Sequence, residues 1–222
     1  MPDPRRAARV DEPPRRLELT ALTRFEDEAL EPGGEYESTL FAALSAGFTA
    51  ERATFLGCGF QRCEFGDAHL RHARLSGCLV EDSSAASLDL GDSSWHDVIL
   101  AGVRFGALRA PGSTWASVRL RDAKVDFIDL TTAKLDSVVF ERCVIGGLDL
   151  GDARATHVRF EGCRLDELNV DGARLTAVDL RGAELATVRG VAGLRGAVVG
   201  PGQLLDLAPF LAAAAGIVVR EA

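Results

Sequence analysis

The chain has 222 residues, a formal net charge of −8 and an apolar content of 47%. No basic patch dominates this acidic composition, which argues against direct binding of nucleic acid. The longest apolar run, from Leu207 to Val219, is interrupted by Pro209 and is too short to span a bilayer, and no signal peptide is evident near Met1, so we expect a cytoplasmic protein without membrane attachment.

The first 52 residues lack the regular pattern that follows them. Residues 1–16 are rich in proline and arginine and are predicted to be a disordered tail. Residues 17–37 mix leucines with acidic residues and contain Pro32-Gly33-Gly34, which predicts a short helix or loose segment followed by a turn. Residues 38–52 are apolar but out of register and are interpreted as a degenerate first turn. We expect residues 17–52 to cover the N-terminal end of a repetitive β-structure.

Residues 53–190 follow a period of five without an insertion. Every residue whose number is a multiple of five is apolar from Phe55 to Leu185, and the position two residues earlier is small or branched from Ala53 to Val188. A period of five fits neither the 3.6 of a helix nor the 2 of a strand. The pattern therefore indicates a repeat architecture.

A second, longer period is superimposed on the first, because every twentieth residue matches. The string Leu88-Asp89-Leu90-Gly91-Asp92 recurs intact at residues 148–152, and branched side chains return at Val98, Val118 and Val138. Four five-residue units per turn explain both periods, and each turn then lies directly over the last. The 28 positions in the small-residue column amount to about seven turns.

This pattern resembles the pentapeptide-repeat family, whose unit is roughly Ala-Asp/Asn-Leu-x-x. Ala183-Glu184-Leu185 and Val178-Asp179-Leu180 follow the unit well, whereas the position before the central residue is often Arg, Lys or Ser elsewhere. The resemblance implies an all-β fold, a right-handed quadrilateral parallel β-helix. Here it would have about seven regular turns and a short C-terminal helical cap. The small residue and the central residue of each unit would point inward.

Two sets of inward side chains have special chemistry. Trp95 and Trp115 are expected to stack on successive turns as core residues, between Leu75 and Leu135. All five cysteines also fall in the small inward column. We expect them to be buried thiols in a reducing compartment, although neighbours in the column are close enough for a disulfide by Cα distance. The cysteines are Cys58, Cys63, Cys78, Cys143 and Cys163.

The repeat ends near Gly190, and residues 191–222 are predicted to form a C-terminal cap. A helix is expected from Gln203, with Pro209 either kinking it or starting a second short helix, and a closing strand at residues 217–219. Similar C-terminal modules pair some members of the resembled family, so this segment could also mediate a homodimer. Candidate cap and dimer residues are Leu204, Leu207, Phe210 and Leu211.

No catalytic or metal-binding arrangement is apparent, and we expect neither an enzyme nor a cofactor. Ser93, Ser94, His96 and Asp97 are close in sequence but lack the context of a nucleophile elbow. The four histidines are not at metal-ligand spacings, and no CxxC occurs. The uninterrupted repeat also leaves no long loop that could build a pocket.

The outward positions define faces that differ in charge. The basic face (residues 133–137, 153–157 and 173–177) carries Lys134, Arg154 and Arg174, and the third face (98–102, 118–122, 138–142 and 158–162) shows Ile99 and Val139 among arginines. The acidic face comprises residues 88–92, 128–132, 148–152 and 168–172, and Arg109 interrupts it. Its carboxylates are the candidate interaction site: Asp89, Asp92, Asp129, Asp149, Asp152 and Asp171.

These observations leave two functions open. The first is a non-catalytic scaffold that binds an unknown protein partner. The second, which the family resemblance implies, is a DNA mimic that binds DNA gyrase or another type II topoisomerase and protects it from quinolone-type inhibitors. Duplex DNA over seven turns, about 34 Å, carries about 20 negative charges. Residues 51–190 hold 21 acidic and 17 basic residues, so mimicry could only be local.

Overall fold

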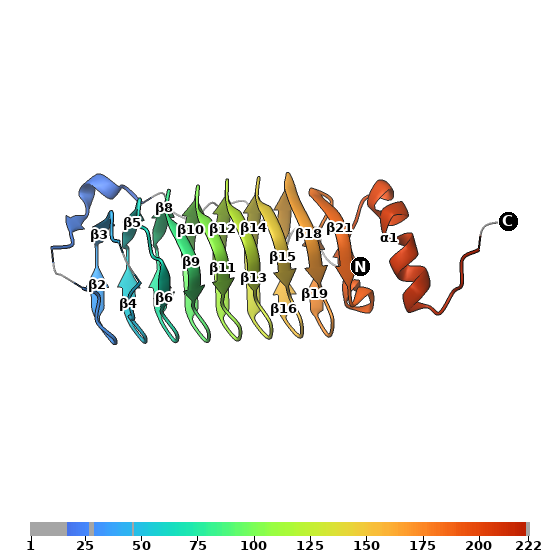
Figure 1. Ribbon diagram of the computed structural model, residues 1–222, viewed down its shortest axis with the longest axis horizontal. Helices are drawn as coiled ribbons and strands as arrows, with labels where there is room; N and C mark the ends of the chain where they lie inside the picture. The colour runs from blue at the N-terminus through green and yellow to red at the C-terminus, as the bar shows by residue number, and fades with distance from the viewer. Residues whose placement is uncertain (1–16, 27–28, 46, 221–222) are drawn as a thin grey trace.

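The molecule is a long coil with its turns stacked along one axis. The computed structural model describes residues 17–26, 29–45 and 47–220, so the tail predicted for residues 1–16 lies outside the described residues. Figure 1 shows the stacked turns and a single α-helix at the C-terminal end of the coil. Strands on successive turns pair in parallel, for example β10 with β12 and β11 with β13. The predicted class, a parallel β-helix with a C-terminal helix, is confirmed.

Two parallel sheets wrap the four sides. A 15-stranded sheet covers the basic and third faces, and a seven-stranded sheet covers the acidic face and a fourth face, residues 103–107 and their equivalents. The larger sheet contains β1 (Thr23–Arg24), β2 (Glu35–Glu37), β3 (Thr39–Ala42), β4 (Thr54–Leu56), β5 (Gly59–Gln61), β7 (Arg74–Ser76), β8 (Leu79–Glu81), β10 (Ser94–Ala101), β12 (Thr114–Arg121), β14 (Lys134–Glu141), β16 (Arg154–Thr156), β17 (Arg159–Glu161), β19 (Arg174–Thr176), β20 (Val178–Asp179) and β22 (Ala197–Val198). The smaller contains β6 (Asp67–His69), β9 (Ser84–Asp89), β11 (Arg104–Arg109), β13 (Lys124–Asp129), β15 (Val144–Asp149), β18 (Cys163–Asn169) and β21 (Ala183–Arg189).

The central turns keep the register that the sequence predicts, in which each residue lies over its counterpart one full repeat later. Trp95 pairs with Trp115, and Leu108 pairs with Ile128. Backbone hydrogen bonds join the turns, such as the 3.0 Å bond from Lys124 N to the Val103 carbonyl. Like side chains therefore lie over like, and both predicted columns point into the core.

The two ends of the coil use a different register, in which the offset between turns is one residue shorter. Tyr36 pairs with Phe55 and Phe41 pairs with Phe60, and Asp179 pairs with Val198 at the same shorter offset. The missing residue explains why residues 38–45 look out of register in the sequence, whereas Thr49 already pairs with His69 at the regular offset. The coil consequently has about nine turns, not the seven predicted from the regular repeat alone.

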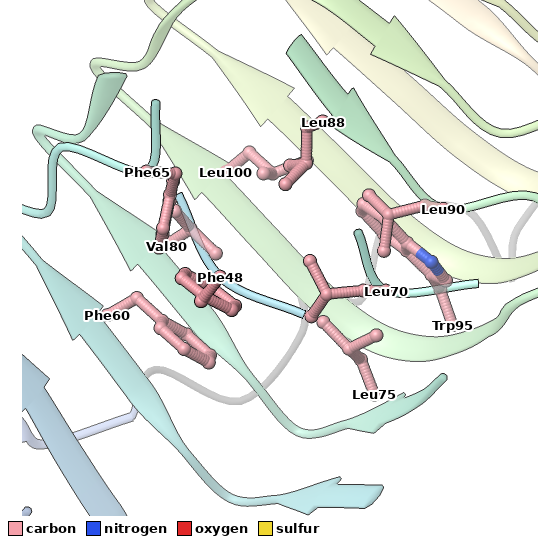
Figure 2. Close-up of a pocket in the computed structure, with 10 residues that line it drawn as sticks. All are labelled: Phe48, Phe60, Phe65, Leu70, Leu75, Val80, Leu88, Leu90, Trp95 and Leu100. Atoms are coloured by element: carbon pink, nitrogen blue, oxygen red, sulfur yellow. The ribbon is translucent and has the colours of Figure 1, made fainter. Parts of the chain in front are cut away.

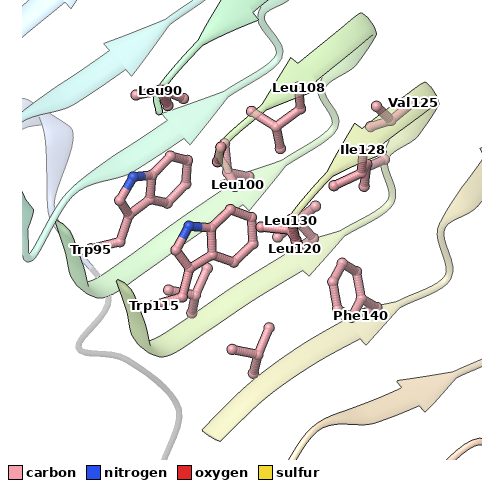
Figure 3. Packing of buried hydrophobic residues seen from close by; sticks show 14 of the residues in the cluster. Leu90, Trp95, Leu100, Leu108, Trp115, Leu120, Val125, Ile128, Leu130 and Phe140 are labelled. Atoms are coloured by element: carbon pink, nitrogen blue, oxygen red, sulfur yellow. The ribbon is translucent and has the colours of Figure 1, made fainter. Parts of the chain in front are cut away.

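Aromatic stacking fills the middle of the core. The rings of Trp95 and Trp115 are stacked with centroids 4.6 Å apart and planes inclined by 18°, as Figure 3 shows. Leu75 and Leu135 pair with them on the outer sides, as predicted. The indole nitrogen of Trp95 donates a 2.8 Å hydrogen bond to Oγ of Ser93, which satisfies a polar atom inside the core.

Residues in the left-handed backbone region recur at the corners of the coil. Asp92 and Asp97 have φ of 55° and 53°, and Ala177 has φ of 52°. Asp tolerates this region better than most side chains, whereas Ala gains nothing there. The corner geometry therefore selects residue types at positions that face water.

One α-helix covers the C-terminal end of the coil. The chain leaves β21, forms the 3₁₀-helix η3 (Val191–Leu194) and then α1 (Pro201–Ala214), which includes Pro209. Leu207 of α1 is buried against the last turns, and Phe210 is half-buried there. Nε2 of Gln203 donates to the carbonyls of Leu180 and Ala183, at 2.6 and 2.7 Å. Gln203 thus gives the Ala183 carbonyl a donor at the end of the sheet, and it adds a second donor to the Leu180 carbonyl, which already accepts the N–H of Ala183.

The closing strand predicted at residues 217–219 is wrong. Ile217, Val218 and Val219 form no strand and are 60–78% exposed. The last strand is instead β22, which pairs with β20 before α1 begins. A run of three β-branched residues favours a strand locally, but the neighbouring strand edge is already occupied by β22.

Residues 17–22, the first described residues, lie on the outside of the third face. Residues 17–22, here called the N-terminal strap, include the 3₁₀-helix η2 (Leu19–Ala21) and lead into β1. Leu17 and Leu19 pack on an external cluster of Leu79, Ile99 and Ala101. The strap explains why Ile99, predicted to face outward, is only 9% exposed.

Candidate interaction surfaces

The aspartates of the acidic face stabilise backbone turns, a role that was not predicted from the sequence. Oδ1 of Asp149 accepts a hydrogen bond from the backbone N–H two residues later, that of Gly151, at 2.8 Å. The same turn is made by Asp89 and Asp129. Such a side-chain turn fixes the backbone as it enters a corner. The recurrence of Asp-Leu-Gly in the sequence was the signal that could have revealed it.

The six predicted carboxylates do not form one continuous surface. Arg71 approaches Asp89 at 3.5 Å and Asp92 at 3.0 Å, and Arg109 lies between Asp89 and Asp129 in the ladder. Sequence reasoning missed Arg71 because it lies one turn before the residues that defined the face. The N-terminal half of the face is therefore close to neutral.

The C-terminal half of the acidic face keeps its negative charge. Three successive turns, residues 128–132, 148–152 and 168–172, carry four carboxylates and no basic side chain. Asp152 and Asp171 are exposed, and Asp129 and Asp149 are half-buried by their turns. We call this surface the anionic patch; its members are Asp129, Asp149, Asp152 and Asp171.

The basic face carries like charges in register. Lys134 pairs with Arg154, and Arg154 pairs with Arg174, so three cationic side chains lie on adjacent turns. All three are exposed. Water and salt screen their repulsion, but the arrangement does not favour stability.

The fourth face holds an exposed apolar feature that was not singled out in the sequence. Phe127 is 42% exposed, and a Cβ atom on Gly147 would lie 2.9 Å from its ring, so the ring rests over that glycine. Val144 on the same face is 45% exposed. Single exposed apolar residues are common on protein surfaces, and these two do not make a large patch.

The described residues line an internal void and two shallow grooves. An apolar void of about 30 Å³ lies inside the coil, lined by side chains such as Phe65, Leu88 and Trp95 (Figure 2). Its lining offers no polar group to a substrate or a water molecule. A shallow groove of about 320 Å³ separates α1 from Val188 and Val191, and another of about 450 Å³ lies at the corner near Cys143 and Cys163.

Three histidines, His69, His96 and His157, approach carboxylates. His96 approaches Asp97 at 3.2 Å, and His157 approaches Asp136 at 3.3 Å. Within residues 17–26, 29–45 and 47–220, no three metal-ligating side chains gather into a site. No helix in the same part of the chain is long and apolar enough to cross a membrane.

Comparison with known proteins shows which family and which solved structures the repeat resembles. The family model described as "Pentapeptide repeats (8 copies)" matches residues 145–182, and no curated protein sequence matches significantly. Similar solved structures include QnrB1, a plasmid-mediated fluoroquinolone resistance protein, at 19% identity over 82% of this chain and 100% of that chain, with a TM-score of 0.34. HetL, involved in heterocyst differentiation in the cyanobacterium Nostoc, is 18% identical over 77% of this chain and 91% of its own, with a TM-score of 0.39. Residues 145–182 therefore match the pentapeptide-repeat model, and the same five-residue units continue without a break on both sides of that match.

Proposed function

We propose that the coil is a non-catalytic cytoplasmic scaffold that binds a protein partner through the anionic patch. The observation that carries this proposal is the run of three turns with four carboxylates and no basic side chain. A rigid ladder holds these charges at fixed spacing, so little conformational entropy is lost when a partner binds. A cationic protein surface is the complementary chemistry.

The test removes charge without removing the turns. Asn keeps a side-chain oxygen that accepts the same backbone N–H and also tolerates the left-handed corner at Asp152. We expect a quadruple variant with Asn at positions 129, 149, 152 and 171 to melt like the wild type and to lose the partner captured from a cell lysate. Asp126→Asn with Asp136→Asn, on neighbouring faces, is the control. Identical sets of captured proteins for all three chains would refute the patch as the binding surface.

A second candidate is that this partner is DNA gyrase or a related type II topoisomerase, with the patch replacing DNA. Three turns extend about 14 Å, over which one DNA strand carries about four phosphates at one per ~3.4 Å. The four carboxylates of the patch equal that local density, although the coil as a whole does not. This match favours mimicry of one phosphate strand, and such a contact would protect the enzyme from quinolone-type inhibitors by competing with DNA.

A supercoiling assay separates the two candidates. Under the gyrase proposal, the wild-type chain inhibits supercoiling at micromolar concentrations, and inhibition weakens as salt rises. The quadruple Asn variant should inhibit far less. If the wild type neither inhibits supercoiling nor relieves a gyrase poison, the gyrase proposal fails while the scaffold proposal is judged by partner capture alone.

We also propose that α1 mediates a homodimer. Leu207 and Phe210 face the coil, whereas Leu204 and Leu211 are 52% and 37% exposed, and Leu205 is 76% exposed. Two helices that bury these leucines against each other would remove apolar surface from water. Light scattering should give a dimer for the wild type and a monomer for Leu204→Glu with Leu205→Glu. A monomeric wild type at micromolar concentration would refute the dimer.

A further inference from the structure

Two cysteines lie in register at one corner of the coil. Glu141 pairs with Glu161 and Val144 pairs with Arg164, which places Cys143 directly beside Cys163 on the next turn. Both are buried free thiols. Neighbouring parallel strands are about 4.8 Å apart, which lies within the Cα separation that a disulfide accepts, roughly 4.4–6.8 Å.

An open groove gives this pair a route to solvent. The groove of about 450 Å³ is lined by residues of this corner that include both cysteines, Gly162 and Gly182. Gly162, directly before Cys163, has φ of 61°. The thiols themselves are only 1–2% exposed, so a reagent in the groove reaches them when this corner opens locally.

The two thiols are chemically unequal. Sγ of Cys163 donates to the Phe140 carbonyl at 3.2 Å, and Sγ of Cys143 donates to the Leu120 carbonyl at 3.5 Å. The interaction of each thiol with its neighbour lowers the pKa of Cys163 and raises the pKa of Cys143. Cys163 is therefore the better nucleophile at neutral pH, because the thiolate is the reactive form.

We propose that Cys143 and Cys163 form a dithiol site that is oxidised by small disulfides. The Cys163 thiolate attacks one sulfur of the small disulfide, forming a mixed disulfide and releasing the first thiolate. Cys143 then loses its proton and attacks the sulfur of Cys163, which forms the protein disulfide and releases the second thiolate. The two cysteines lose two electrons in total, and the two protons go to the two released thiolates. The small disulfide is thereby reduced to two thiols.

The remaining cysteines provide comparisons within the same chain. Cys63 has Ser83 as its neighbour in the column, with Oγ accepting from Cys63 N at 3.0 Å, so it has no stacked thiol there. Cys58 and Cys78 are stacked like the reactive pair but line neither open groove. Differences in oxidation rate among these thiols therefore depend on access to solvent as well as on stacking against a second thiol.

The test treats the folded full-length chain with oxidised glutathione, quenches free thiols with an alkylating reagent and maps disulfides by mass spectrometry. We expect the link between Cys143 and Cys163 to form about tenfold faster than the link between Cys58 and Cys78, with Cys63 remaining reduced. Equal rates for the two pairs, or a link between Cys143 and Cys163 that forms only in denaturant, would overturn the proposal.

Single variants check the order of the steps. In Cys143→Ser the second step is blocked, so a mixed disulfide with glutathione should accumulate on Cys163. In Cys163→Ser neither product should form at this corner, and Cys58→Ser should leave the link between Cys143 and Cys163 unchanged. Absence of the mixed disulfide in a Cys143→Ser chain that melts like the wild type would also overturn the proposal.

Discussion

The side-chain amide of Asn169 donates a 2.9 Å hydrogen bond from Nδ2 to Oδ1 of Asp149, which lies one turn earlier in the same row. That oxygen also accepts the N–H of Gly151. A single carboxylate oxygen thus supports its own corner and the next turn. The aspartates of the acidic face therefore contribute to the stability of the coil as well as to its charge.

We expect Asp149→Ala to lower the free energy of unfolding by about 1–2 kcal/mol, because two donors lose their acceptor. Asp149→Asn, which retains an oxygen, should cost less than about 0.5 kcal/mol. Chemical denaturation measures both. Equal losses for the two variants would mean that charge, and not the hydrogen-bonded turn, is what stabilises this position.

Leu150→Asp should destabilise the coil by several kcal/mol. Leu150 is 2% exposed in an inward column, and a carboxylate there would have neither water nor a partner. Asp126→Lys, at an exposed position, should change the free energy of unfolding by less than about 0.5 kcal/mol. Similar shifts in melting temperature for the two variants would contradict the assignment of inward and outward positions.

Ala177→Gly should stabilise the protein. Ala177 has φ of 52°, where an L residue is strained by roughly 1–2 kcal/mol and glycine is not. Glycine loses more entropy on folding, so a net gain of about 0.5–1 kcal/mol is expected. The control is Ala173→Gly, which lies outside the left-handed positions and should destabilise. A lower melting temperature for Ala177→Gly would show that the corner is not strained.

Arg154→Glu should raise stability by a few tenths of a kcal/mol. The change replaces repulsion from Lys134 and Arg174 on the flanking turns by attraction to both. The gain should shrink at 1 M salt, where screening acts over about 3 Å. Thermal melts at low and high salt test this, and a gain that does not depend on salt would require a different cause.

The contribution of the C-terminal cap to stability should come only from the side of α1 that faces the coil. Leu207→Ala should cost about 2–4 kcal/mol, because Leu207 is 3% exposed against the last turn. Gln203→Ala should cost about 1–3 kcal/mol, since the Ala183 carbonyl loses its side-chain donor while the Leu180 carbonyl keeps only the N–H of Ala183. Leu205→Ala is the matched control and should leave the melting temperature of the monomer unchanged. Loss of stability in the control would mean that both sides of the helix are packed.

The central coil could be predicted because the sequence pattern that produces it is short and is repeated in every turn. The period of five fixes which side chains point inward, and the longer period fixes which ones stack, so the partners of Trp95 and Trp115 follow from their numbers. The ends could not be predicted in this way. One missing residue shifts Tyr36 and Phe41 out of the numerical pattern, although they still stack on Phe55 and Phe60.

The surface was harder to predict than the core. Packing of Leu17 on the cluster of Leu79, Ile99 and Ala101 joins residues far apart in the sequence, and no period signals it. Arg71 neutralises Asp89 and Asp92 across a turn boundary, which requires the pairing to be known. The turn made by Asp149 and Gly151 was readable in principle, but the recurring aspartate was interpreted only as charge.

The constant register of the central turns restricts how the length of this protein can change. Removing residues 110–129 would delete one complete turn and leave Trp95, Phe140 and every later side chain on its original face, because the deletion equals the interval at which turns pair. A deletion one residue shorter at the same place would leave one central turn short of the regular offset, and that turn would have to absorb the difference as the end turns do. During evolution, insertions and deletions in the coil should therefore occur in whole turns. The two ends are the exception, because the shorter offset is already accommodated there.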